Sequence, residues 1–443
     1  MTANTHPVNW KLHGKIFGFV TLIAALTPMS SQALPVFARQ TGQNCVACHA
    51  GGQFPELTPY GRLFKLTGYT IGARANPLAV MGVASSSSIS KPPDGTTKNV
   101  TPIFATGSLF LAGKITDNIG AFTQFTYDPY TENEDGSISG HTSVDNIDVR
   151  FANHIIADKN DWIYGVSLNN NPSVSDPWNT AAAWMQYVPV PSPSSSAFID
   201  GTAPFPGYAS DGNIAGLNAY LYWNRMVYAE VGTYRTADKA LSFMAAGVNP
   251  RTQLSGNNNP YWRLALTHEW GPHNLMIGTS GMVAHKYDDA TNTTDPSTVG
   301  KFRNTGLDAQ YQYILDPHTV TAQVVRMKTD TTYSDAFNAA SAVNPGMNDT
   351  TTVSRAKLTY TYQAKYGGSL SAFNQTGTNN QGLGDPTTRG NTYEAFFIPV
   401  QNVRVGAQYT SYSTYQGASI NYDGAGRNAS DNNSMFLYVW FAY

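Results

Sequence analysis

From about Asn76 to the C-terminus, apolar and polar residues alternate in segments of roughly ten residues, separated by turn-forming residues. The run 147–155 has mostly apolar residues at odd positions and mostly polar ones at even positions, and the run 403–409 has the same split. Successive side chains of a strand point to opposite faces, so a period of two predicts strands with one apolar face.

The links between these segments are alternately short and long. The predicted short turns fall near 117–118, 157–160, 224–225, 271–272, 316–317, 367–368 and 401–402. The predicted long loops fall near 90–101, 130–142, 172–212, 237–259, 288–300, 332–350, 378–390 and 417–432. Short turns at one end and long loops at the other are typical of outer-membrane barrels. We therefore predict an all-β, transmembrane outer-membrane β-barrel of about 16 antiparallel strands over residues 76–443, beginning near 78–87 and ending at 433–443.

The last segment has apolar residues on both faces. One face carries Met435, Leu437, Val439, Phe441 and Tyr443, which resembles the C-terminal assembly signal of outer-membrane proteins. The other face carries Phe436, Tyr438 and Trp440, an unusual set for a wet lumen, and indicates that something apolar, such as a plug, packs there. A soluble all-β sandwich or propeller is the alternative fold. The barrel is favoured because a closed sheet leaves no edge unpaired in lipid.

Composition and the first residues indicate export. Charged residues make up 13% of the 443, about half the ~25% usual for globular proteins. The net charge of −2 and the lack of a basic stripe argue against a nucleic-acid partner. Residues 1–33 have a basic start, an apolar stretch and a small-residue cleavage position, which predicts a secretory signal peptide. The predicted location is the outer membrane of a Gram-negative bacterium.

The chemistry is concentrated in residues 34–75, where Cys45-Val46-Ala47-Cys48-His49 forms a C-x-x-C-H motif. This spacing is typical of c-type haem attachment, in which both thiols form thioethers and the histidine supplies one axial nitrogen to the iron. The chain has only these two cysteines. A disulfide across so short a loop would stabilise little, a thioredoxin-like pair requires a βαβ context, and a zinc site requires two more nearby ligands. We therefore expect one covalent haem c.

The sequence offers several candidates for the sixth ligand of the haem iron. Met81 is the first candidate for the sixth ligand, with His154, Met276 and Met282 as others on the predicted lumen face. For each of them an ordinary lining residue is the favoured interpretation, and an open or water-bound position is a further alternative. A methionine ligand raises the haem potential, whereas two histidines lower it.

Charged residues near the motif and in the predicted strands have two interpretations. Arg62 is the candidate partner for a haem propionate, with Arg39 and Lys65 behind it, because arginine makes bidentate contacts to carboxylates. Solvated surface charges are the alternative.

Six charged residues fall on the predicted lumen face, as a polar lumen requires: Asp148, Arg150, Glu230, Arg355, Lys357 and Arg404. The Pro- and Ser-rich loop 172–212 either folds inward as a constriction or lies on the surface.

The motif and its flanking residues resemble a known family. The run Phe37 to Gly42, the C-x-x-C-H motif and the run FPELTPYGRLFKLTGY at 54–69 are similar to the fused monohaem cytochrome c–porins of the outer membrane. The resemblance covers about 35 residues closely and the barrel only in architecture; the extra Gly51-Gly52 pair departs from the pattern. It implies that the haem segment is a barrel plug, and that electrons pass from extracellular Fe(II) to a periplasmic carrier such as a soluble cytochrome c.

The expected function is therefore an outer-membrane electron conduit, and the resemblance implies Fe(II) oxidase activity. A lone attached haem without acid–base partners favours one-electron transfer over peroxidase-like chemistry. The alternative is a diffusion porin or solute channel that the haem-bearing segment plugs or gates.

Overall fold

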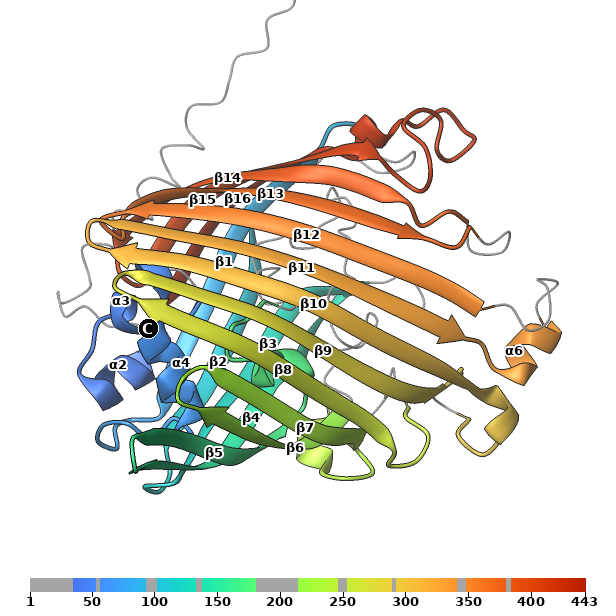
Figure 1. Cartoon of the computed structure of the whole chain (residues 1–443). Coiled ribbons are helices and arrows are strands. Elements are labelled where there is room, and N and C mark those ends of the chain that lie inside the picture. The colour runs from blue at the N-terminus through green and yellow to red at the C-terminus, as the bar shows by residue number, and fades with distance from the viewer. Residues whose placement is uncertain are drawn as a thin grey trace, which may run out of the picture. The chain divides into compact units, whose positions relative to one another are not determined.

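In the computed structural model, the described residues are 35–52, 56–92, 102–132, 138–180, 214–245, 253–288, 292–340, 348–379 and 384–443 (Figure 1). The predicted signal peptide lies outside them. The strands are β1 (Leu78–Ile89), β2 (Ile103–Lys114), β3 (Ile119–Glu132), β4 (Ile138–Ala157), β5 (Asn160–Asn169), β6 (Ile214–Trp223), β7 (Val227–Thr236), β8 (Asn259–Trp270), β9 (His273–Tyr287), β10 (Val299–Leu315), β11 (His318–Thr332), β12 (Asn348–Tyr362), β13 (Tyr366–Gly377), β14 (Thr388–Val400), β15 (Val403–Thr414) and β16 (Ser434–Ala442).

These strands form one closed antiparallel sheet. Each pairs with its neighbours in the sequence, and β1 pairs with β16, so that Met81 lies opposite Ala442 and Val83 opposite Trp440. The closure leaves no unpaired edge, which is the condition for a sheet within lipid. The prediction of a barrel of about sixteen antiparallel strands is confirmed.

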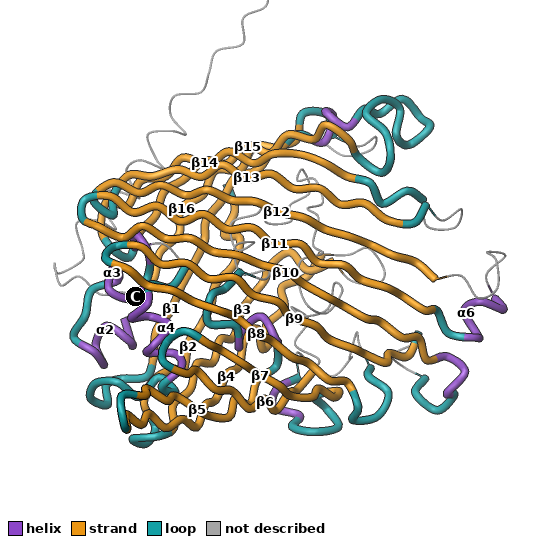
Figure 2. The backbone as a smooth tube through the Cα atoms, viewed as in Figure 1, coloured by secondary structure: helices purple, strands orange, loops and turns teal. Residues whose placement is uncertain are grey.

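The hairpin connections are short at one end of the barrel and long at the other (Figure 2). One predicted turn was wrong. The chain reverses at 363–365, where Gln363 and Ala364 adopt positive φ values of 53° and 51°, whereas Gly367 and Gly368 lie inside β13. A Cβ atom at Gly367 would overlap the ring of Phe396. The two glycines therefore permit close packing within the wall instead of forming the turn.

The two faces of the wall differ in polarity. On β16, Leu437 is 49% exposed and Tyr438 only 3%. Exposed apolar side chains cover the outside of the other strands, among them Leu109, Leu217, Val231, Leu266, Ile277, Leu307, Val324 and Leu370. Buried polar side chains line the inside, among them Asn218, Gln310, Gln312, Thr361 and the six charged residues predicted to face the lumen, Asp148, Arg150, Glu230, Arg355, Lys357 and Arg404. The outer surface therefore faces lipid.

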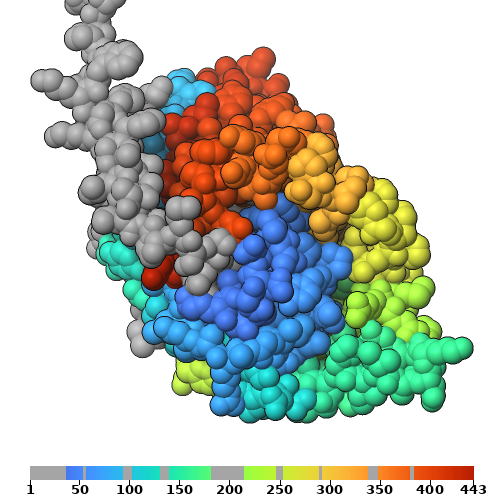
Figure 3. All heavy atoms as spheres, turned by 90° about the vertical axis from the view of Figure 1, so that its left-hand side faces the viewer, coloured from blue at the N-terminus to red at the C-terminus, as the bar shows by residue number. Residues whose placement is uncertain are grey.

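The residues before β1 form short helices at the barrel end with the short turns (Figures 1 and 3). The helices and helical turns among the described residues are α2 (Pro35–Thr41), α3 (Cys45–Cys48), η1 (Ala50–Gly52), α4 (Pro59–Leu66), α5 (Pro172–Ser175), η3 (Ser242–Met244), η4 (Pro296–Thr298), α6 (Asp335–Ala340) and η5 (Ala429–Asn432). None of the described helices combines the length and apolar character needed to cross a bilayer. We call residues 35–75 the plug segment.

Local signals in the sequence account for both ends of helix α4. The Thr58 hydroxyl accepts a hydrogen bond from the backbone N–H of Gly61 at 3.1 Å, and Pro59 occupies the first turn, where its missing N–H costs nothing. The helix ends at Leu66, and Gly68 follows with a φ of 73°. A left-handed glycine just after a helix is a common stop signal.

Buried contacts fix the plug segment to opposite sides of the wall. Lys357 Nζ on β12 lies 2.9 Å from Glu56 Oε1, and both side chains are at most 8% exposed. Across the barrel, the Tyr69 hydroxyl donates to Asp148 on β4 at 2.6 Å. The Tyr220 hydroxyl donates to the carbonyl of Leu66 at 2.7 Å. The segment is thus held as a plug in the lumen of the barrel.

We predict that Lys357→Met destabilises the folded protein strongly, because Glu56 would keep a buried charge without its partner. Loss of one partner of a buried ion pair costs about 3–5 kcal/mol. Lys328→Met is the matched control: its pair with Asp330 is exposed, so its loss should cost at most about 1 kcal/mol. Denaturant unfolding of the detergent-folded protein, followed by tryptophan fluorescence, measures both. Equal effects of the two substitutions would contradict the role of the buried pair.

Candidate haem-attachment site

The C-x-x-C-H motif forms a single helical turn that ends at its histidine. Cys45 and Cys48 begin and end α3, and side chains three residues apart lie on the same face of a helix. His49 leaves the helix with extended backbone angles, φ −119° and ψ 128°, while its N–H still donates to the Cys45 carbonyl at 2.8 Å. Both cysteines are free thiols. The turn therefore presents two sulfur atoms and one imidazole within five residues.

Helix α4 supports this turn directly. The backbone N–H of Thr58 donates to the Cys48 carbonyl at 2.9 Å, and its hydroxyl donates to the Ala47 carbonyl at 2.5 Å. A Cβ atom at Gly61 would overlap the Cys48 carbonyl oxygen, so only glycine permits this approach. The spacing between the motif and Thr58–Gly61 is thus a packing requirement.

The Gly51-Gly52 pair, which departs from the family pattern, forms the reversal after the motif. The two glycines have φ values of 61° and 71°, in the left-handed region that glycine favours. Gly52 donates its N–H to the His49 carbonyl at 2.9 Å. A Cβ atom at Gly51 would lie 2.7 Å from the hydroxyl oxygen of Thr361 on β12. The pair therefore lets the chain turn against the barrel wall.

The thiols have different surroundings. Cys45 is 1% exposed, and its Sγ lies 3.5 Å from the carbonyl oxygen of Gln401, in the turn between β14 and β15. Cys48 is half-buried. Burial raises the pKa of Cys45 to about 12 and that of Cys48 to about 11, so both are neutral near pH 7. Two unpaired, neutral thiols beside a histidine fit the donor set of a covalent haem c.

The cations proposed for the haem propionates are engaged elsewhere in this fold. Arg62 is 2% exposed and donates to Asn274 Oδ1 on β9 at 2.6 Å and to Gln312 Oε1 on β10 at 3.1 Å. Arg39 donates to the backbone carbonyl of Leu78. The structure therefore uses Arg62 and Arg39 to attach the plug segment to the barrel, and their propionate role stays a prediction.

The ammonium group of Lys65 also donates a hydrogen bond to an acceptor within the protein. Its Nζ donates to the carbonyl of Asp176 at 2.9 Å, within the lumen. Burial lowers the pKa of Lys65 to about 8, with a further lowering from the charge of Arg150, and nearby carboxylates oppose the shift. The propionate role proposed for Lys65 stays a prediction as well.

The four candidates for the sixth ligand lie in different parts of the barrel. Met81 faces inward on β1 and packs against two apolar clusters, one of which contains Val36 of the plug segment. Met276 packs with Leu66 among aromatic residues, and Met282 belongs to a cluster formed by barrel residues alone. His154 Nε2 lies 2.7 Å from Asp161 Oδ1. Met81 and Met276 are thus the candidates that the structure brings to the plug segment.

The first part of the long loop after β5 folds into the lumen. Helix α5 and the residues up to Thr180 are largely buried, and Trp178 is fully buried against Leu66 and the rings of Tyr222 and Tyr228. This agrees with the inward alternative for loop 172–212; residues 181–212 lie outside the described residues. We call residues 171–180 the inward loop.

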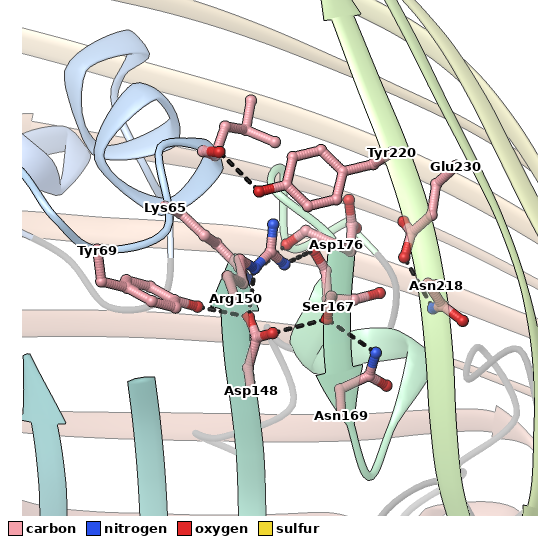
Figure 4. A network of polar contacts seen from close by, with 12 residues as sticks. Lys65, Tyr69, Asp148, Arg150, Ser167, Asn169, Asp176, Asn218, Tyr220 and Glu230 are labelled. Carbon is pink, nitrogen blue, oxygen red and sulfur yellow. Dashed lines mark hydrogen bonds and ion pairs between the residues drawn. The ribbon is translucent and has the colours of Figure 1, made fainter. Parts of the chain in front are cut away.

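Charged residues attach the inward loop to both the wall and the plug segment (Figure 4). Arg263 on β8 bridges Asp176 of the loop at 3.1 Å and Asp308 on β10 at 2.7 Å. Arg150 donates to the carbonyl of Ser175 at 2.7 Å and pairs with Asp148, which also accepts from Tyr69. The lumen between α4 and strands β4–β10 is therefore filled by packed, hydrogen-bonded side chains.

Sequence reasoning missed several of these residues. Arg263 on β8 and Asp308 on β10 lie at inward positions of strands in which buried and exposed residues alternate. The period of two could therefore have placed both residues in the lumen. Asp176 and Trp178 lie in a loop without periodicity, and nothing in their local sequence indicates that they turn inward.

Three solved structures show what the chain is similar to. OmpF of Salmonella typhi in complex with daunomycin has 11% identity and a TM-score of 0.43, with 83% of this chain and 97% of that chain covered. The outer-membrane channel DcaP of Acinetobacter baumannii has 10% identity and a TM-score of 0.46, with 83% and 96% covered. An anion-selective porin from Comamonas acidovorans has 9% identity and a TM-score of 0.42, with 83% and 98% covered.

No family model and no curated protein matches the chain. Its own strand pairing and surface are therefore the basis for describing it. The sheet is closed, the outside is apolar and the lumen-facing side is polar. By these features the chain is a porin-like β-barrel of the Gram-negative outer membrane.

Proposed function

We propose that the protein is an electron conduit of the outer membrane, with one haem c attached to Cys45 and Cys48 and ligated by His49. The observation that carries the proposal is the C-x-x-C-H turn: two free thiols on one helical turn, held inside a lipid-facing barrel. When bound, the haem supplies a one-electron couple whose potential depends on its axial ligands and its burial. Fe(II) outside the cell is the proposed donor, on the resemblance of residues 37–69 to the cytochrome–porins.

An electron conduit needs its haem at a fixed position, and residues of the plug segment can provide this. The contacts of Glu56, Arg62 and Tyr69 hold the motif at a fixed position in the barrel. The short-turn end, where the motif lies, faces the periplasm in outer-membrane barrels. The proposed acceptor is accordingly a soluble periplasmic carrier, such as a cytochrome c, and the donor would act from the long-loop side.

A diffusion porin is the second candidate function, and the porin-like wall with its polar lumen favours it. The plug segment and the inward loop argue against a wide channel, because Trp178, Leu66 and Arg263 are packed inside the described part of the lumen. We therefore place the conduit first.

We predict that Cys45→Ala/Cys48→Ala, expressed with a c-type maturation system, yields a barrel without covalently bound haem. Thioether formation requires the sulfur atoms, so no haem should remain on the denatured polypeptide in a haem-stained gel. Val46→Ala is the matched control, since it changes an exposed residue within the motif and keeps its spacing. Wild-type protein without covalent haem would contradict the proposal.

We also predict that Fe(II) added outside proteoliposomes reduces the haem, while sugars do not enter the vesicles quickly. Stopped-flow absorbance follows the haem, and liposome swelling follows the sugars.

Trp178→Ala removes a large buried side chain and should increase sugar entry, with Trp262→Ala on the lipid face as control. Covalent haem that Fe(II) does not reduce would exclude the iron assignment, and rapid swelling with the wild type would support the porin.

A further inference from the structure

Several stretches of the lumen wall are apolar: one lies on β16 and β1, and others surround Met276, Met282 and Phe110. The inward residues of β16 are Ser434 and, after it, Phe436, Tyr438, Trp440 and Ala442; the last four are 2–6% exposed and form one cluster, against which Met81 and Val83 of β1 pack. We call this cluster together with Met81 and Val83 the wall patch. Elsewhere the lumen wall carries residues such as Gln310, Gln323, Thr359 and Gln408. Because a polar interior is the rule for such barrels, each inward aromatic cluster requires a specific reason; Leu66 of the plug segment packs in the cluster around Met276.

The wall patch lies beside the haem-attachment turn. Gln401, whose carbonyl contacts Cys45 Sγ, forms a turn with Asn402, and the backbone N–H of Ala442 donates to the Asn402 carbonyl at 3.0 Å. The patch thus begins at the turn that Cys45 touches. On its other side, Met81 also packs against the cluster that contains Val36 and Phe37 of α2. The plug segment therefore borders the patch at both α2 and α3.

The plug segment is too small to enclose a porphyrin on its own. Its α-helices contain seven, four and eight residues. A segment of this length cannot bury a large apolar group without packing on another surface. The wall patch is the apolar part of the wall next to Cys45.

We propose that the wall patch is the barrel's half of the haem pocket and contacts the apolar porphyrin attached at Cys45 and Cys48. This inference rests on the proposed function and extends it to the wall, including four residues of β16 that lie nearly 400 positions from the motif. The patch excludes water from the haem and holds it in one orientation. Because burial in apolar surroundings disfavours the charged oxidised form, the patch raises the haem potential.

Polar neighbours fix the orientation of the patch. The Tyr438 hydroxyl donates to Glu394 Oε1 at 2.5 Å, and Arg404 pairs with the same carboxylate at 2.7 Å. The Arg404 guanidinium carbon also lies 3.9 Å from the ring centroid of Phe396 and 5.8 Å from that of Tyr438. The Tyr438 ring is therefore held between its stacked neighbour Phe436 and a fixed ion pair, as a preformed binding surface.

The test compares two buried lumen tyrosines in the holoprotein, Tyr438 in the patch and Tyr261 on β8. They are 3% and 2% exposed, and the cluster around Tyr261 contains no plug residue. Tyr438→Gln should lower the ratio of reduced to oxidised haem at fixed potential about tenfold, a shift of about 59 mV for one electron, whereas Tyr261→Gln should leave it unchanged. Potentiometric titration of the Soret band measures both.

A milder variant covers the case in which Tyr438→Gln does not fold. Trp440→Leu keeps the patch apolar but changes its shape, so it should alter the circular dichroism of the Soret band while the haem stays covalently bound. Unchanged Soret dichroism in Trp440→Leu, or equal haem potentials in the two tyrosine variants, would contradict the proposed contact between the wall patch and the haem. Neither result would contradict the proposed electron-conduit function. Wild-type protein without covalent haem would overturn both.

Discussion

The structure depends on one constraint, the pairing of every backbone polar group within the bilayer. The hydrogen bonds between β1 and β16 meet it by closing the sheet, and the difference between a lipid-facing outside and an enclosed lumen follows from that closure. A closed sheet of this size has an outside that must be apolar and an inside that must be filled or wet. Here the inside is occupied by the plug segment and the inward loop, which supply buried partners for wall residues such as Lys357, Asp148 and Arg263.

The plug segment in turn depends on the wall. Its helices are short, and its internal packing is limited to small groups such as the rings of Phe37, Phe64 and Tyr69. Buried ion pairs and hydrogen bonds to the wall replace a core of its own. Such contacts are costly to desolvate, but each fixes one arrangement because a displaced partner would leave a charge buried without compensation. The C-x-x-C-H turn is consequently held in one position although it belongs to a segment too small to fold alone.

Local patterns in the sequence predicted much of this architecture. The period of two placed the strands, the inward charges and the two faces of β16. The motif at Cys45–His49 was recognisable because its spacing lies within one helical turn. The wrong turn at Gly367-Gly368 shows the limit of this approach, since a glycine serves equally for a turn and for close packing.

Contacts between distant residues could not be predicted. Glu56 and Lys357 are 301 positions apart, and only strand register brings them together. Likewise, the direction in which Arg62 points depends on Asn274 and Gln312, which carry no local signal.

The distribution of these attachments around the cylinder has a mechanical consequence. The plug segment contacts β4 through Tyr69, β6 through Leu66, β9 and β10 through Arg62, and β12 through Glu56. Contacts to strands on several sides of the barrel resist its flattening under lateral pressure from the surrounding lipids. The cross-section at this end is therefore braced from within, and the C-x-x-C-H turn lies inside the braced part of the barrel.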